Sequence, residues 1–161
     1  MIRAMPIWIK ETGDLQIREM ATELLKNAGC TSRLKIKKQF PGGRLVGGKY
    51  HPHTDTITLY TETIRRQCEL LFGSCEWFLP YATIVLAHEI GHAMDENLSL
   101  LSAAFEESGH LPEKQALALT IEQNAWDFAG QLIPTHLEPL FQKIMDESLS
   151  AYRQPVMAGA Y

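Results

Sequence analysis

Residues 83–96 of this chain read TIVLAHEIGHAMDE, and this stretch restricts the possible fold more than any other. Its apolar lead-in predicts a buried helix, on which residues four apart lie on the same face. His88 and His92 therefore present two nitrogens toward one point, with Glu89 beside them. Burying two imidazoles and a carboxylate is unfavourable unless they find partners. Of the two interpretations, a core helix with hydrogen-bonded histidines and one half of a metal site, we favour the metal site.

Gly91 lies inside the same stretch, directly before His92. A glycine in a helix interior costs about 1 kcal/mol relative to alanine, which indicates that another backbone segment approaches closely at that turn. The arrangement His-Glu-x-x-His is typical of helices that bind zinc through both histidines and use the glutamate as a general base.

A catalytic zinc site usually has three protein ligands and a water molecule. The candidates for the third ligand are Asp95, Glu96, His110, Glu122 and Cys75. Glu122 is favoured because it lies on the next well-marked helix, beside an apolar stripe that faces the core. Asp95 is better placed to accept a hydrogen bond from a ligand imidazole. His110 stays open as an alternative.

The rest of the sequence predicts one α+β domain over residues 1–161, with its core in residues 30–134. Alternating apolar and polar residues predict three strands, at 33–40, 44–50 and 56–61. We expect these strands to form a small antiparallel three-stranded sheet, packed on the histidine-bearing helix and further helices. The run at 56–61 is also a candidate edge strand, along which an extended substrate could pair.

Helices are expected around this sheet, at 12–29, 63–72, 81–94, 112–133 and about 137–150. Residues 96–111 are ambiguous between a short helix and a loop. Residues 151–161 show no periodicity and are expected to form a flexible tail.

Length, charge and composition exclude several classes of partner. The 161 residues suit one domain, and a formal net charge of −4 offers no basic surface for phosphates, so we expect no nucleic-acid partner. No apolar run approaches the ~20 residues that span a bilayer, and the N-terminus lacks the pattern of a signal peptide. The three cysteines indicate no disulfide framework. We therefore expect a cytoplasmic protein without a membrane partner, and we expect it to be a monomer.

HEIGH at 88–92, followed at 121–134 by IEQNAWDFAGQLIP, resembles the ImmA/IrrE family of bacterial and phage metallopeptidases. That family carries a His-Glu-x-x-His helix and a later helix with the pattern E-x-x-A-x-x-F-A-x-x-L. Here the second pattern is matched by Glu122, Ala125, Phe128, Ala129 and Leu132. The resemblance covers residues 45–134 and implies a zincin-like metallopeptidase domain of the gluzincin type, in a minimal single-domain form.

Carried over by position, the resemblance implies that His88, His92 and Glu122 bind Zn²⁺ and that Glu89 is the catalytic base. Glu89 would take a proton from a metal-bound water that attacks a peptide carbonyl, and would pass it to the leaving amine. The implied substrate is a protein or peptide, such as a regulatory or repressor protein. The alternative is a catalytically silent, metal-stabilised module that acts by protein contact, as an antirepressor does.

The chain departs from the larger gluzincins at one position. They place an aspartate four residues after the third ligand to orient a histidine, whereas this chain has Trp126 there and Asp127 next to it. Trp126 is expected in the core. The motifs do not identify a group that stabilises the transition state, and the candidates are Tyr152, Tyr161, His110 and His136.

Overall fold

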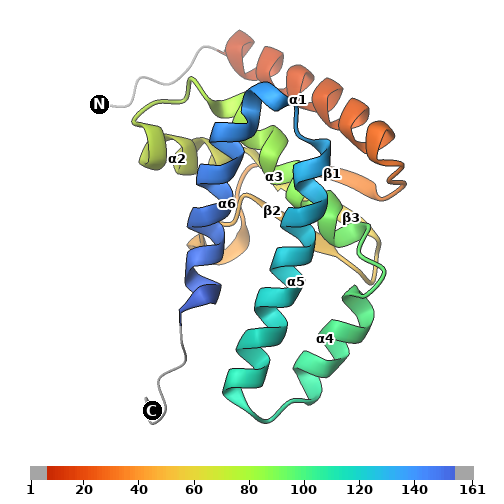
Figure 1. The fold of residues 1–161 in the computed structure, drawn as a ribbon. Helices are drawn as coiled ribbons and strands as arrows, with labels where there is room; N and C mark the ends of the chain where they lie inside the picture. The colour runs from red at the N-terminus through yellow and green to blue at the C-terminus, as the bar shows by residue number, and fades with distance from the viewer. Residues whose placement is uncertain (1–6, 155–161) are drawn as a thin grey trace.

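Six helices and a three-stranded sheet make up the computed structural model, which describes residues 7–154, with side chains from residue 14 onward (Figure 1). The elements are α1 (Ile7–Ala28), β1 (Arg33–Lys37), the 3-10 turn η1 (Pro41–Gly43), β2 (Gly48–His51), β3 (Thr56–Tyr60), α2 (Thr61–Phe72), α3 (Phe78–Ala93), α4 (Leu98–Glu107), α5 (Leu111–Leu132), the 3-10 turn η2 (Thr135–Leu137) and α6 (Glu138–Arg153). The predicted α+β class is confirmed. No helix within the described range combines the length and apolar composition needed to cross a bilayer.

The sheet has the strand order β1-β3-β2 and is mixed, so the prediction of an all-antiparallel sheet was wrong. β2 runs antiparallel to β3, with Tyr50 opposite Ile57. β1 runs parallel to β3, with Leu34 opposite Ile57. The chain leaves β1 through residues 38–47 and returns in β2 at the far side, so the β2–β3 hairpin places β3 in the middle. Alternation along a strand reports which residues are buried, not which strand lies beside it.

β3 is therefore the central strand and not an edge, which corrects the second expectation for this segment. All five of its residues are buried, as expected for a strand with a neighbour on each side. Within the described residues, β2 pairs with no strand other than β3, so its second edge faces away from the sheet.

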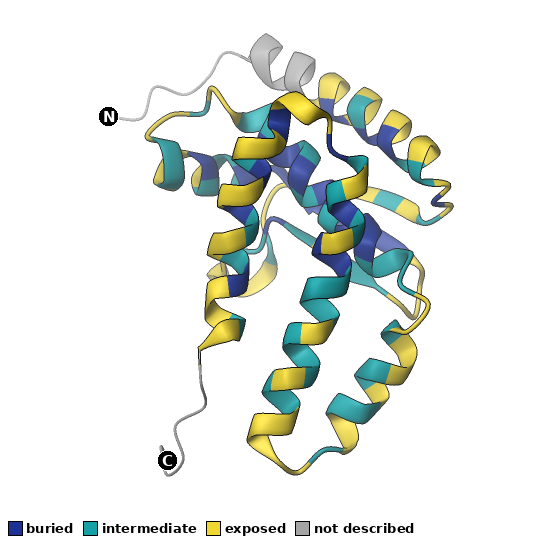
Figure 2. Cartoon of the chain, in the orientation of Figure 1, coloured by how far each residue is buried: buried dark blue, intermediate teal, exposed yellow. Residues whose placement is uncertain are grey.

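α3 is the central helix and contacts α1, α2, α5, α6, β2 and β3. Figure 2 shows buried residues along α3 and on the inner faces of the helices around it, while the outer faces are exposed. The core includes Ile17 and Leu24 of α1 and Phe141 and Ile144 of α6. It thus extends beyond residues 30–134 at both ends, because both flanking helices are amphipathic and bury one face.

Two expected segments have a different extent in the structure. The ambiguous stretch at 96–111 contains a helix, α4, which packs along the first half of α5 (Figure 1). α6 continues to Arg153, so the first residues of the expected flexible tail are helical. The rest of that tail, residues 155–161, lies outside the described residues.

The backbones of α3 and α5 come close together at Gly91. A Cβ atom at this position would meet the carbonyl oxygen of Ala125 and would lie 2.8 Å from its carbonyl carbon and from its Cα atom. Real Cβ atoms do not approach backbone atoms so closely, so only glycine fits. The close backbone approach predicted from the sequence is confirmed.

We expect Gly91→Ala to destabilise the protein by about 2 kcal/mol or more, because the added methyl group would meet backbone that cannot move aside. Gly130 on α5 provides a matched control, since a Cβ atom there would meet only the Phe141 ring, at 3.6 Å. Gly130→Ala should be neutral or stabilising by up to about 1 kcal/mol through helix propensity. Urea unfolding of both variants is the measurement, and equal stabilities would contradict the close helix contact.

Candidate metal centre

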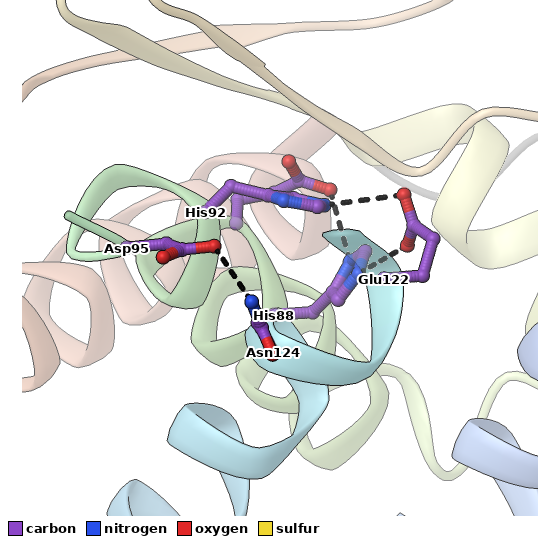
Figure 3. Close-up of polar contacts among 6 residues, drawn as sticks. His88, His92, Asp95, Glu122 and Asn124 are labelled. Carbon is purple, nitrogen blue, oxygen red and sulfur yellow. Dashed lines mark hydrogen bonds and ion pairs between the residues drawn. The ribbon is translucent and has the colours of Figure 1, made fainter. Parts of the chain in front are cut away.

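Two histidines of α3 and one glutamate of α5 point toward one another (Figure 3). Nε2 of His88 lies 2.8 Å from Oε2 of Glu122, and Nε2 of His92 lies 3.4 Å from Oε1 of the same carboxylate. Each residue offers one ligand atom, and these atoms lie within 4.8 Å of one another. The structure thus brings together the three residues that the sequence predicted as metal ligands.

The geometry fits a metal ion. Ligand atoms at ~2.0–2.1 Å from a tetrahedrally coordinated ion lie about 3.3 Å apart, and the nitrogen–oxygen separations of 2.8 and 3.4 Å, each to a different oxygen of Glu122, are of this size. The side chains of the three residues are only 12–17% exposed, so they are largely withdrawn from bulk water. The group of His88, His92 and Glu122 could therefore hold a metal ion.

The hydrogen bonds between these side chains shift their proton affinities. Burial alone would lower the pKa of His88, but the hydrogen bonds to Glu122 and Glu89 outweigh it and raise this pKa to about 9. Burial alone would raise the pKa of Glu122, but the hydrogen bonds with His88 and His92 lower it to about 2. Without a metal ion, a protonated imidazole and a carboxylate thus form an ion pair at the site.

Glu89 lies beside this group and is 6% exposed. Its Oε1 atom is 3.3 Å from Nδ1 of His88. The backbone of β2 lies close to its side chain: a Cβ atom at Gly48 would lie only 2.9 Å from Cγ of Glu89. Gly48 was not among the residues predicted for the site, although the Gly47-Gly48 pair at the start of a strand is a signal for close approach.

A cavity of about 620 Å³ opens in front of these four side chains. It is bounded by the segment that leads into β2 and by residues of α3, α5 and α6. Most of its lining is apolar and includes Leu45, Val46, Val85, Leu98, Ile121 and Ile144. The polar lining residues include the four site side chains and also Lys49, Gln67, Glu147 and Ser148.

Tyr152, near the end of α6, is the one sequence candidate for transition-state stabilisation that lines this cavity. Burial raises the pKa of its hydroxyl, and the charges of Glu122 and Glu89 raise it further. The hydroxyl therefore keeps its proton at neutral pH and can donate a hydrogen bond. Of the other candidates, His110 and His136 are exposed and do not line the cavity, and Tyr161 lies outside the described residues.

Asp95 does not support an imidazole, which corrects the role predicted for it. Its carboxylate accepts hydrogen bonds from the side chain of Asn124, at 3.3 Å, and from the backbone N–H of Asn97, at 2.9 Å (Figure 3). The reason is that α3 ends at Ala93, so Asp95 lies beyond the regular helix and faces the start of α4 and the side of α5.

The remaining candidates also lie away from the metal centre. Glu96 is exposed, and the thiol of Cys75 donates a hydrogen bond to Glu69 at 3.1 Å. Asp127 is exposed and accepts a hydrogen bond from Gln123 on its own helix. Trp126 is buried, as predicted, but it also stacks on the ring of His88.

Comparison of the chain with models of known protein families, with curated proteins and with solved structures gives no match. The chemistry of the site therefore has to be argued from the arrangement of its own residues.

Glu122→Ala should lower the affinity for Zn²⁺ by more than about 100-fold, which exceeds the loss typical of residues that only support a ligand. Glu147 lines the same cavity from α6 but does not belong to the group of possible ligands. Glu147→Ala is therefore the matched control and should bind Zn²⁺ nearly as the wild type does. Isothermal titration of the metal-free proteins measures both affinities, and an unchanged affinity of Glu122→Ala would remove Glu122 from the ligand set.

The stability of the metal-free protein should fall between pH 6.5 and 9. The pKa of His88 is higher in the folded protein, at about 9, than its ordinary value of 6.5. The ion pair of His88 therefore contributes fully to the stability of the folded protein below pH 6.5, and this contribution is lost as the pH rises through 9. Glu122, whose pKa is lowered to about 2, contributes above pH 4.5 and loses its contribution only in strong acid.

Urea unfolding in the presence of a chelator, at several pH values, measures this dependence. Glu122→Gln removes the carboxylate and should flatten the decline between pH 6.5 and 9. An equally steep decline in that variant would mean that other groups cause it.

Proposed function

We propose that this protein is a zinc-dependent metallopeptidase of the gluzincin type, similar to the ImmA/IrrE family, with His88, His92 and Glu122 as the zinc ligands. The observation that carries the proposal is that three side chains from two helices meet beside the buried Glu89, at the wall of a cavity. Two histidines and one glutamate are the ligand set of several zinc peptidases. A bound zinc ion would supply a Lewis acid for a water molecule and a peptide carbonyl.

Glu89 is the proposed general base. It lies beside His88 but outside the group that could hold the metal ion, so its carboxylate is available for proton transfer. It takes a proton from the attacking water molecule and delivers it to the amine nitrogen as the peptide bond breaks. Close contact with Gly48 of β2 limits the positions that the side chain of Glu89 can adopt.

The proposed substrate is an extended segment of a protein, such as a regulatory or repressor protein. β2 has an edge that pairs with no described strand, and Gly48, Lys49 and Tyr50 of this strand line the cavity. An extended polypeptide can add to such an edge through main-chain hydrogen bonds, which depend little on its side chains. β2, and not the strand at 56–61, is therefore the proposed edge strand for substrate pairing.

A silent metal-stabilised module that acts by protein contact is the competing function. A metal ion with a purely structural role needs its ligands but no general base beside them. The buried position of Glu89 next to the ligands therefore favours an enzyme.

We expect Glu89→Gln to bind Zn²⁺ normally but to lower the rate of peptide hydrolysis by a factor of about 10²–10⁴, the usual contribution of a general base. The measurement is cleavage of a disordered polypeptide by the zinc-loaded protein, together with its zinc content. Glu96→Gln is the control, because Glu96 is exposed and lies just after the same helix.

Undiminished cleavage by Glu89→Gln would reject the base assignment. A wild-type protein that binds zinc but cleaves neither disordered polypeptides nor candidate repressors would instead favour the protein-contact module.

A further inference from the structure

Trp126 covers one face of the His88 ring. The ring centroids are 4.3 Å apart and the ring planes are inclined by 19°, which is a stacked arrangement. Trp126 follows Glu122 by four residues on α5, so both side chains lie on the same face of that helix, one turn apart. Two successive turns of α5 thus hold both Nε2 and the ring face of the same histidine.

Stacking restricts a movement of His88 that its hydrogen bonds do not restrict. Glu122 lies 2.8 Å from Nε2 and Glu89 lies 3.3 Å from Nδ1. These two contacts act at the ring nitrogens and do not cover the ring face. The flat indole of Trp126 blocks a tilt toward its side.

Trp126 is itself held firmly in place. It is 3% exposed, and the ring of Phe141 on α6 packs edge-on against it, with the centroids 5.6 Å apart. Among the described residues its indole N–H has no hydrogen-bond partner. A buried tryptophan N–H usually has an acceptor. Because this one has none, the contact of Trp126 with the site is made by its ring surface.

We propose that Trp126 is a positioning residue, which orients the imidazole of His88 by stacking where a carboxylate would otherwise do so by hydrogen bonding. This inference rests on the proposed metal site. An imidazole that is bound to a metal ion shares its positive charge, and tryptophan attracts a cation over its ring face more strongly than other aromatic residues do. The indole face therefore attracts the His88 ring both when the ring carries a proton and when it is bound to a metal ion.

The first test is the affinity of the full chain for Zn²⁺, measured by calorimetry. Trp126→Leu should bind Zn²⁺ about 10–100-fold more weakly, the loss typical of a residue that orients a ligand. Trp126→Phe keeps a flat ring and should restore the affinity to within a few-fold of the wild type. Leu149→Ala is the control for lost core volume, because Leu149 is fully buried but does not line the cavity.

The second test uses fluorescence, which reports whether Trp126 lies beside the bound metal ion in solution. The chain has three tryptophans, so replacing Trp8 and Trp77 by phenylalanine leaves Trp126 as the only emitter. One equivalent of Co²⁺, an open-shell ion that suits the same ligands, should quench this emission. Co²⁺ binding without any change in emission would show that the rings do not stack in solution, and would overturn the proposal.

The outcomes separate this inference from the proposed function. If the wild type binds Zn²⁺ and Trp126→Leu binds it equally well, the metal site stands and the positioning role is overturned. The positioning role is also overturned if Leu149→Ala loses as much affinity as Trp126→Leu. If the wild type binds neither Zn²⁺ nor Co²⁺, the proposed function fails and the positioning role fails with it.

Discussion

Two helices can touch backbone to backbone only where no side chain stands between them, and α3 and α5 meet in this way at Gly91 and Ala125. This contact sets the distance between the helix that carries His88 and His92 and the helix that carries Glu122. Gly91 directly precedes His92, and Ala125 follows Glu122 by three residues, so the contact lies within a turn of the candidate ligands. The separations of 2.8 and 3.4 Å at the site depend on it.

The interface between α3 and α5 also holds buried charged groups, which balance one another. Removing ionised groups from water is costly unless they are paired and hydrogen-bonded. In the metal-free protein His88 and Glu122 balance one another, which is why the pKa of the imidazole rises and that of the carboxylate falls. A metal ion would replace the proton on His88 while retaining the carboxylate as a partner.

How much could be predicted from the sequence depended on how local each feature is. The spacing of His88, Glu89 and His92 follows from helix geometry, and Gly91 indicated a close contact by its cost alone, so both were read correctly. Glu122 was predicted to lie near the histidines because it lies beside the apolar stripe of its helix, and the structure places it there. The strand order was missed because β1 pairs with β3 across an intervening strand of the chain. The stacking of Trp126 on His88 was missed because it depends on the packing of two helices.

The contact at Gly91 also bears on how chains with this architecture can diverge. Exposed positions on α1 and α6 can change freely, but a larger residue at position 91 would push α5 away and carry Glu122 with it. The small residues at 91 and 125 thus determine the geometry of the candidate metal centre although neither contributes a possible ligand atom. A chain that keeps this helix contact should therefore also keep a glycine at position 91.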